Sequence, residues 1–275
     1  MSAPRFLSSF SMEGKVCVIT GAARGLGNVF CHALVESGCN QIVIIDLFPA
    51  DAEAAAKELV RHFEENAGVK PGSVEAIGYG VDVSNEDAVK AAFVQIVQKW
   101  GKVDVVITAA GIVENFSALT YPTERIKKLF DINVHGTYFC AREAAKHMIE
   151  RGNKGSIILI SSMSAKVVNQ PQLQTPYNAS KAAVTHMASS LAVEWAKSGI
   201  RVNSLSPGYM LTQLTKTILD KPENAGLRPV WESMTPMGKM GDPSELKGAI
   251  VYLASDASSF TTGTDLRVDG GYTCI

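Results

Sequence analysis

Short apolar, β-branched runs alternate with longer stretches of helical periodicity along most of the chain. Unbroken apolar runs of about four to eight residues are typical of strands that are buried on both faces of a parallel sheet. The predicted strands are Lys15–Thr20, Gln41–Asp46, Val74–Gly80, Val103–Thr108, Gly155–Ser161 and Ile200–Leu205. The predicted helices include Leu26–Ser37, Pro49–Ala67 and Thr175–Ser198. A further helix is predicted to begin after Ser84 as its cap, with Asp87 completing the cap pattern, and to run to about Trp100.

This alternation predicts an α/β fold, a single Rossmann-type, doubly wound parallel sheet with helices on both faces. No internal repeat or shift in composition marks a second domain, so residues 1–275 are interpreted as one dinucleotide-binding domain. The segment 209–242 has weak periodicity and is rich in Pro, Gly, Met and Thr. A stretch of this length within a compact domain is usually functional, and we expect it to form a variable substrate lid.

Composition and charge narrow the range of partners. The 275 residues are 46% hydrophobic and 19% charged, with a net charge of −1 and no long basic run, so neither nucleic acid nor a membrane is an expected partner. The five cysteines are scattered and lack metal-type spacing, which argues against a disulfide framework and against a metal site. The N-terminal sequence MSAPRFLSSF has no apolar stretch of signal-peptide length, so a cytoplasmic location is expected.

A glycine-rich turn follows the first predicted strand. Gly21, Gly25 and Gly27 stand between this strand and the next helix. Glycines there let the backbone turn tightly and let a pyrophosphate approach the helix N-terminus, where free N–H groups and the helix dipole favour anions. A packing turn without a ligand is the competing interpretation. The strand before, the helix after and an acid at the end of the second strand favour the dinucleotide site.

That acid is Asp46, which can accept hydrogen bonds from both ribose hydroxyls of NAD and would repel the 2′-phosphate of NADP. A strand-end or helix-capping role is the alternative for Asp46. Arg24 in the glycine-rich turn complicates the choice, because a basic residue there could meet a 2′-phosphate. The carboxylate favours NAD as the cofactor, with NADP as the less favoured alternative.

A candidate catalytic group lies in the TPYNASKAAV segment. Tyr177 and Lys181 are four residues apart, which puts both side chains on one face of the predicted helix. An ammonium beside a phenol favours the phenolate, so we expect a lowered tyrosine pKa and proton exchange with an alcohol or carbonyl oxygen. Ser162 directly follows a buried strand, where ligands of open α/β sheets bind. No G-x-S-x-G elbow surrounds Ser162, which argues against a hydrolase.

Taken together, these motifs resemble the short-chain dehydrogenase/reductase family over about residues 14–273. The resemblance implies that Tyr177 is the general acid/base, that Lys181 binds the nicotinamide ribose and lowers the tyrosine pKa, and that Ser162 orients the substrate. It also implies that Asn133, in DINVHGTY, completes a proton relay through water. The cofactor-binding residues that it implies are Gly21, Arg24, Gly25, Leu26, Gly27, Asp46, Asp82, Val83, Ala110, Gly111, Tyr177, Lys181, Pro207, Gly208, Met210 and Thr212.

Two departures from the family pattern affect this interpretation. Ala109-Ala110-Gly111 stands where the family usually has Asn-Ala-Gly, so Ala109 lacks the amide that is expected to tie the central strands together. We interpret this as a local structural substitution, because no proton-transfer group is lost. The gap between Ser162 and Tyr177 is longer than is common in the family, so Ser164 must be weighed against Ser162 as the catalytic serine. Ser162 is preferred because it directly follows the strand.

The loop 163–176 and the ending DGGYTCI resemble the branch of the family that acts on sugar alcohols and ketoses. Oxidation of a polyol such as D-arabinitol to its ketose is therefore the expected reaction, with an NADPH-dependent ketose, carbonyl or 3-ketoacyl reductase as the alternative. A non-catalytic dinucleotide-binding sensor is the alternative outside enzymes. The candidate substrate-binding residues are Ser164, Asn169, Gln172 and Glu114. The resemblance also implies a homotetramer or homodimer.

Overall fold

The fold is built on one parallel sheet, described here by a computed structural model that covers residues 7–220, 224 and 226–275. The strand order is β3-β2-β1-β4-β5-β6-β7, and every pairing in it is parallel. The strands are β1 (Val16–Thr20), β2 (Gln41–Asp46), β3 (Glu75–Gly80), β4 (Val105–Thr108), β5 (Gly155–Ile160), β6 (Ile200–Pro207) and β7 (Asp265–Val268). The order reverses direction between β1 and β4, and open α/β sheets bind ligands at such a switch point.

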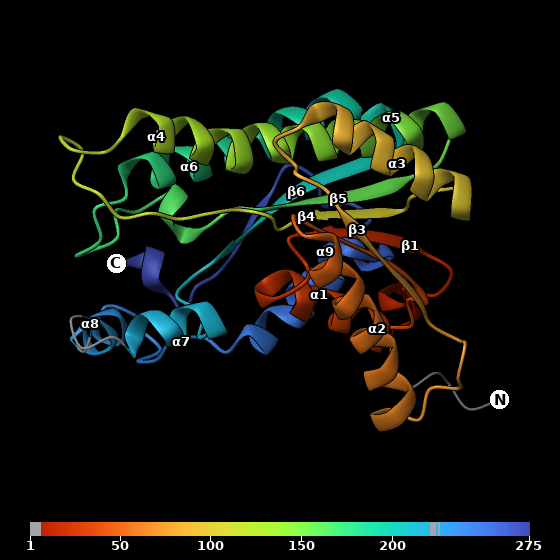
Figure 1. Cartoon of the computed structure of the whole chain (residues 1–275), viewed down its shortest axis with the longest axis horizontal. Coiled ribbons are helices and arrows are strands. Elements are labelled where there is room, and N and C mark those ends of the chain that lie inside the picture. The colour runs from red at the N-terminus through yellow and green to blue at the C-terminus, as the bar shows by residue number, and fades with distance from the viewer. Residues whose placement is uncertain (1–6, 221–223, 225) are drawn as a thin grey trace.

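Helices cover both faces of the sheet, as Figure 1 shows. One face carries α1 (Gly25–Glu36), α2 (Pro49–Asn66) and α9 (Lys247–Ala254), and the other carries α3 (Glu86–Trp100), α5 (Thr137–Arg151) and α6 (Thr175–Trp195). Three further helices, α4 (Thr123–Phe130), α7 (Gln213–Leu219) and α8 (Leu227–Ser233), lie toward the end of the molecule where the C-terminus is. The predicted α/β fold class is therefore confirmed.

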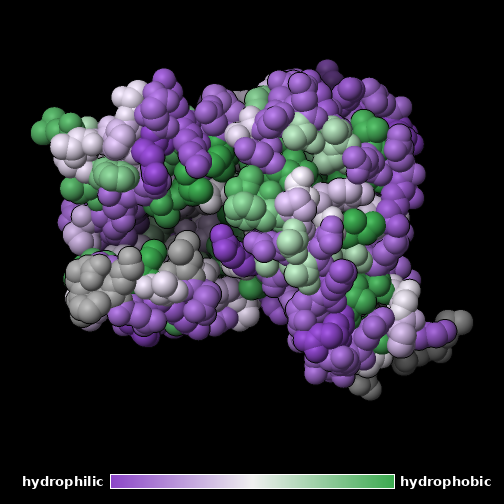
Figure 2. Space-filling view, in the orientation of Figure 1, coloured by the Kyte–Doolittle hydropathy of each residue, from purple (hydrophilic) through white to green (hydrophobic). Residues whose placement is uncertain are grey.

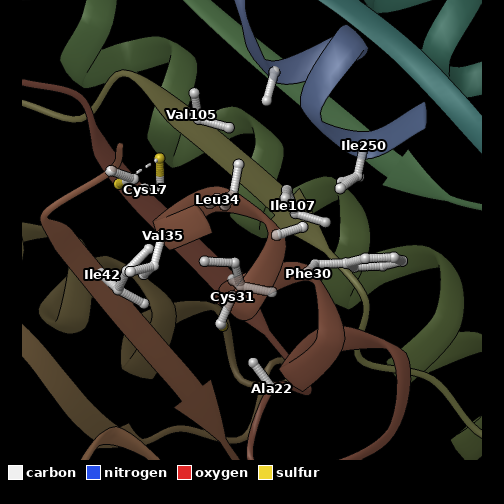
Figure 3. Close-up of a cluster of buried hydrophobic side chains, with 14 of the residues drawn as sticks. Cys17, Ala22, Phe30, Cys31, Leu34, Val35, Ile42, Val105, Ile107 and Ile250 are labelled. Atoms are coloured by element: carbon white, nitrogen blue, oxygen red, sulfur yellow. Dashed lines mark hydrogen bonds between the residues drawn. The ribbon is translucent and has the colours of Figure 1, made fainter. Parts of the chain in front are cut away.

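The central strands contribute to two hydrophobic cores because successive side chains point to opposite faces of a sheet. In β1, Cys17 and Ile19 pack with Phe30 and Leu34 of α1, whereas Val18 packs in the other core. Figure 3 shows the first of these cores, with Phe30, Cys31 and Leu34 of α1 directed at the sheet. Burial on both faces explains why the strands are unbroken apolar runs rather than alternating ones.

Some local predictions need correction. Ser84 does not cap α3. The cap is Asn85, whose side chain accepts the N–H of Ala88 at 3.1 Å. Ser84 is instead drawn into a turn, because its hydroxyl and its N–H both donate to Asp82 Oδ1. The strand β7 was not predicted, since it is short and half-buried and carries Asp265 and Arg267 among its four residues.

Within the described residues, no helix combines the length and the apolar composition that a bilayer crossing requires.

Close packing between α2 and β3 gives a test of the fold. A Cβ atom on Gly78 would collide with the backbone of Ala52, whereas a Cβ on Gly248 would meet nothing within 4 Å. We expect Gly78→Ala to lower the free energy of unfolding by about 1–3 kcal/mol, because this rigid contact must separate. Gly248→Ala should cause no loss, or a gain of up to about 1 kcal/mol, because alanine favours a helix. Denaturant unfolding measures both, and equal effects of the two variants would contradict the packing described.

Candidate active site

A cleft of about 1020 Å³ opens beyond the carboxyl ends of the central strands. Its walls come from segments far apart in the sequence. They include the turn after β1, the ends of β2, β4, β5 and β6, the start of α6, and α7 and α8. Figure 2 shows the molecule hollowed on this side, between the layer that carries α4 and the segment that carries α7. The size is that of a site for a small-molecule ligand.

The glycine-rich turn forms one end of this cleft. Gly21 has a φ of +63°, and a Cβ atom there would lie 2.6 Å from Ala110 Cα, so only glycine fits this position. The helix α1 begins at Gly25, and the residue before it, Arg24, makes no side-chain cap. The first N–H groups of α1 are therefore available to an anion at the cleft. These features fit a dinucleotide pyrophosphate.

Asp46 lines the same end of the cleft, beside Arg24. Its carboxylate accepts the N–H of Ala23 at 2.9 Å and the N–H of Leu47 at 2.8 Å, which holds the glycine-rich turn against β2. The N-cap of α2 is Phe48, without a side-chain cap bond, so the helix-capping alternative for Asp46 is wrong. The carboxylate and the guanidinium that compete in choosing between NAD and NADP are thus both present in the cleft.

The other predicted cofactor-binding residues line this cleft as well. They are Leu26, Gly27, Asp82, Val83, Ala110, Gly111, Pro207, Gly208, Met210 and Thr212, together with Tyr177 and Lys181. Met210 and Thr212 belong to the predicted lid, in which Met210 forms a β-bridge with Gly241. The helices α7 and α8 are the regular part of this lid, and residues 221–223 and 225 of the segment lie outside the described residues.

Asn133 lies in a π-helical turn, Asp131–Gly136, between α4 and α5. Its side chain is fully buried. The Oδ1 atom accepts the N–H of Ile112 at 2.9 Å, and Nδ2 donates to the Ile112 carbonyl at 2.9 Å. Asn133 therefore fixes the segment that follows β4, where Gly111 lies next to Lys181. Just before Ala109, Thr108 Oγ1 is buried without a hydrogen-bond partner in the described structure, and the Ala110 N–H donates to Thr20 Oγ1 at 3.2 Å.

Tyr177 and Lys181 project from the first turns of α6. Lys181 Nζ lies 5.8 Å from the centroid of the Tyr177 ring and donates a hydrogen bond to the Ile160 carbonyl at 2.9 Å. Burial lowers the pKa of Lys181 to about 8, since a charged ammonium is poorly solvated there. This lysine can therefore lose or gain a proton under mildly alkaline conditions.

The electrostatics of Tyr177 differ from the expectation. Burial raises the pKa of Tyr177 above its usual value, and a hydrogen bond with Ser162 opposes this increase only in part. The predicted lowering of the tyrosine pKa by Lys181 is therefore wrong for the chain by itself, because desolvation of the phenolate is the largest influence on this pKa. The pair still places an acid/base phenol and a proton-bearing amine at one wall of the cleft.

The structure distinguishes the two candidate serines. Both serines line the cleft. The Ser162 hydroxyl acts on the Tyr177 phenol and lowers its pKa, whereas Ser164 is buried and donates to Asn169 Oδ1 at 2.5 Å. Ser162 is thus the serine with access to both Tyr177 and a ligand in the cleft. This placement agrees with the preference for Ser162 that its position after β5 suggested.

Among the candidate substrate residues, Ser164, Asn169 and Gln172 line the cleft but Glu114 does not. The Glu114 carboxylate pairs with Arg125 and accepts a hydrogen bond from Tyr121 at 3.4 Å, so these partners draw it away from the cleft. We therefore remove Glu114 from the candidate substrate residues.

Two aromatic residues that line the cleft were not singled out from the sequence. Tyr209 follows Gly208 directly after β6, and its ring stacks on Trp231 of α8 with 4.3 Å between centroids. Gln172 hydrogen-bonds both of them, through the Tyr209 hydroxyl at 2.9 Å and the Trp231 Nε1 at 3.3 Å. An aromatic residue beside the Pro-Gly pair at a strand end is the signal that could have identified Tyr209.

Comparison with known proteins assigns the family. A family model described as "Enoyl-(Acyl carrier protein) reductase" matches residues 21–273. A solved structure of a short-chain type dehydrogenase/reductase from Mycobacterium marinum is similar, with a TM-score of 0.88 and 37% identity over 98% of this chain and 99% of that one. The chain belongs to the short-chain dehydrogenase/reductase family, which confirms the resemblance carried by its motifs.

Relatives within the family share most of the chain's length. A D-arabinitol 2-dehydrogenase [ribulose-forming] of Scheffersomyces stipitis is 42% identical over 97% of this chain and 96% of that protein. An NADH-dependent L-xylulose reductase of Ambrosiozyma monospora is 38% identical over 98% of each. An NADP-dependent mannitol dehydrogenase of Hypocrea jecorina is 39% identical over 99% of this chain and 97% of that one. Both nicotinamide cofactors thus occur among proteins similar to this chain.

The buried ammonium of Lys181 makes a testable contribution to stability. Its pKa of about 8 lies below that of an unfolded lysine, so the charged form destabilises the fold below about pH 8. This destabilisation disappears as the pH rises through the unfolded value of about 10.4. We expect Lys181→Met to raise the free energy of unfolding by about 1–3 kcal/mol at pH 7 while abolishing activity.

The gain in the free energy of unfolding of Lys181→Met should vanish toward about pH 10.5. Urea unfolding at several pH values measures this gain. Lys197→Met, at an exposed position just after α6, is the control and should change little. A Lys181→Met protein that is less stable than the wild type at pH 7 would contradict the account.

Proposed function

We propose that the chain is an NAD(P)-dependent alcohol dehydrogenase that transfers hydride between NAD(H) and a secondary alcohol or ketone, with a sugar alcohol such as D-arabinitol and its ketose as the substrate pair. The observation that carries this proposal is the meeting of Ser162, Tyr177 and Lys181 at one wall of the cleft, opposite a glycine-rich turn that fits a pyrophosphate. A non-catalytic binder has no use for a buried phenol and ammonium beside its ligand, because their desolvation is costly.

In this proposal NAD(H), held in the cleft, would supply the chemistry of hydride transfer. Residues of the chain bind the cofactor and move the proton. The N-terminus of α1 binds the pyrophosphate, and Asp46 accepts the ribose hydroxyls. Tyr177 Oη takes the proton of the alcohol during oxidation and returns it during reduction, while Ser162 Oγ orients the reacting oxygen.

Lys181 and Asn133 have supporting roles in this proposal. Lys181 binds the nicotinamide ribose and favours the ionised form of Tyr177 once the site is assembled. Asn133 holds the segment beside Lys181 in place and completes the water-mediated proton relay that the family resemblance implies. The π-helical turn that carries Asn133 supports this role, since such turns are frequent at functional sites.

The proposed substrate class is supported by the relatives and by the lining of the cleft. The three relatives described above act, by their names, on arabinitol, xylulose and mannitol. In this chain the amide-bearing residues Gln172, Asn115 and Gln213 line the cleft. A site that hydrogen-bonds hydroxyl groups discriminates strongly against analogues that lack them. Asp46 supports NAD, with NADP as the alternative that Arg24 and the NADP-dependent relative keep open.

Initial rates with pentitols and hexitols, with NAD and NADP side by side at mildly alkaline pH, test this proposal. We expect rapid reduction of NAD with one or a few polyols and slower turnover with NADP, because the Asp46 carboxylate repels a 2′-phosphate. No rate with any polyol, together with consumption of NADPH by ketones or ketoses, would instead support the carbonyl-reductase alternative.

Replacing the proposed acid/base separates an enzyme from a dinucleotide-binding sensor. We expect Tyr177→Phe to lower kcat by about 100-fold or more, because general acid–base catalysis contributes about 10²–10⁴-fold. Its affinity for NADH, measured by fluorescence titration, should stay within about twofold of the wild type, since the pyrophosphate and ribose contacts are intact. Unchanged kcat would overturn the role of Tyr177. Tyr121→Phe, at a buried tyrosine outside the cleft lining, is the control.

We further propose that the chain forms one domain, is cytoplasmic and assembles as a closed dimer or tetramer. One sheet that takes strands from Val16 to Val268 supports a single domain. Exposed apolar side chains on the helices of one face, Tyr138 and Ile149 of α5 and Val193 of α6, support association, since helical faces of this kind are commonly buried in closed oligomers.

A further inference from the structure

A hydrogen-bonded cluster of uncharged side chains lies behind the catalytic serine. Ser162 Oγ donates to Ser164 Oγ at 3.1 Å, and Ser164 Oγ donates to Asn169 Oδ1 at 2.5 Å. Gln174 Nε2 donates to Asn178 Oδ1 at 2.9 Å, and its second hydrogen is shared between Ser164 Oγ at 3.3 Å and Asn169 Oδ1 at 3.2 Å. Ser164, Asn169 and Gln174 are all buried. The cluster therefore has defined donors and acceptors that water does not scramble.

Counting hydrogens fixes the direction of the bond between the two serines. Asn169 Oδ1 carries no hydrogen, and 2.5 Å is an O–H···O distance rather than an N–H···O distance. Ser164 has one hydroxyl hydrogen, and Asn169 takes it. In its hydrogen bond with Ser162, the Ser164 hydroxyl can therefore act only as the acceptor. The hydroxyl hydrogen of Ser162 must point to Ser164.

Asn169 is held in this orientation from its other side. Its Nδ2 donates to the Tyr209 hydroxyl at 3.2 Å, and Tyr209 is itself held by Gln172 and by stacking on Trp231. The amide of Asn169 thus has partners at both ends inside the protein. Asn169 and Ser164 both line the cleft, but their polar atoms are bonded inside the protein, which makes them supports of Ser162.

The hydrogen of Ser162 has two possible acceptors. One is Ser164 Oγ, and the other is the oxygen of Tyr177, whose pKa the hydrogen bond with Ser162 lowers. A single hydroxyl hydrogen cannot serve both at full strength. Ionised Tyr177 receives it only when the Ser162 hydroxyl turns away from Ser164.

We propose that Ser164 is a positioning residue, fixed as an acceptor by Asn169, which holds the hydroxyl hydrogen of Ser162 and competes for it with the ionised form of Tyr177. This inference rests on the proposed function, in which Tyr177 is the general base and Ser162 its partner. The network sets the pH range of catalysis without touching the substrate, because it determines how readily the phenolate gains its hydrogen bond.

Removing the competing acceptor tests this role. Ser164→Ala deletes the hydroxyl but keeps the backbone N–H of residue 164, which donates to Ser162 Oγ at 3.1 Å. We expect the acid limb of kcat/KM against pH, for the preferred polyol, to move to lower pH by about half a unit to one unit. Ser164→Cys, whose sulfur is a weaker acceptor, should shift it less in the same direction. Ser164→Thr restores the hydroxyl and should return the profile toward the wild type.

A second measurement does not depend on turnover. The titration of Tyr177 is read from tyrosinate absorbance, in the presence of NAD, as the difference between each protein and its Tyr177→Phe counterpart. In this titration we expect the Tyr177 pKa of Ser164→Ala to move to lower pH by the same amount. If the wild type oxidises no polyol, the proposed function fails and this titration still tests the role of Ser164.

Ser156→Ala is the matched control, because Ser156 is also a buried serine, with its hydroxyl bonded to the Leu253 carbonyl at 2.7 Å outside the cleft lining. It should leave the titration of Tyr177 unchanged. An unchanged or higher Tyr177 pKa in Ser164→Ala, or an equal shift in Ser156→Ala, would overturn the proposal.

Discussion

The parallel register of the central strands is the constraint on which the candidate site depends. Thr20 of β1 is paired with Thr108 of β4, Thr108 with Leu159 of β5, and Ile160 with Leu205 of β6. The segments that follow these strands therefore leave the sheet at one edge. The glycine-rich turn, the segment held by Asn133, Ser162 and the Pro-Gly turn after β6 meet there although they are far apart in the sequence. A sheet buried on both faces keeps this edge rigid.

The proposed catalytic groups at this edge oppose the stability of the fold. Burial lowers the pKa of Lys181 and raises that of Tyr177, so both groups resist the charged forms that the proposed chemistry uses. Uncharged partners contact both groups: Lys181 Nζ donates a hydrogen bond to the Ile160 carbonyl, and the Ser162 hydroxyl acts on Tyr177. The resulting arrangement favours the neutral form of each group. Perturbed pKa values of this kind are typical of functional sites.

Much of the fold and of the site could be predicted from the sequence, because the signals are local. Continuous apolar runs identify buried strands, and a glycine turn with Asp46 after the next strand identifies the dinucleotide end of the cleft. The cap of α3 was misassigned because Asp82 captures the neighbouring Ser84. Glu114 was misplaced because its partner Arg125 approaches only in the folded chain.

The raised pKa of Tyr177 could not be predicted from the sequence either, because the burial that causes it arises only when the cleft is assembled. The same holds for the contact of Tyr209 with Trp231, which joins the turn after β6 to α8. The chain from Ser162 through Ser164 to Asn169 depends on the path of a loop. Spacing alone could identify Ser162, Tyr177 and Lys181, but it could not show which hydrogen each of them holds.

The most direct test of the account is a crystal structure of the chain with NADH and a polyol or ketose substrate. The account predicts that the reacting oxygen lies in the cleft, within about 3.2 Å of both Tyr177 Oη and Ser162 Oγ, with Ser164 still bonded to Asn169. A substrate oxygen that is bonded to neither Tyr177 nor Ser162, or a substrate bound outside this cleft, would contradict it.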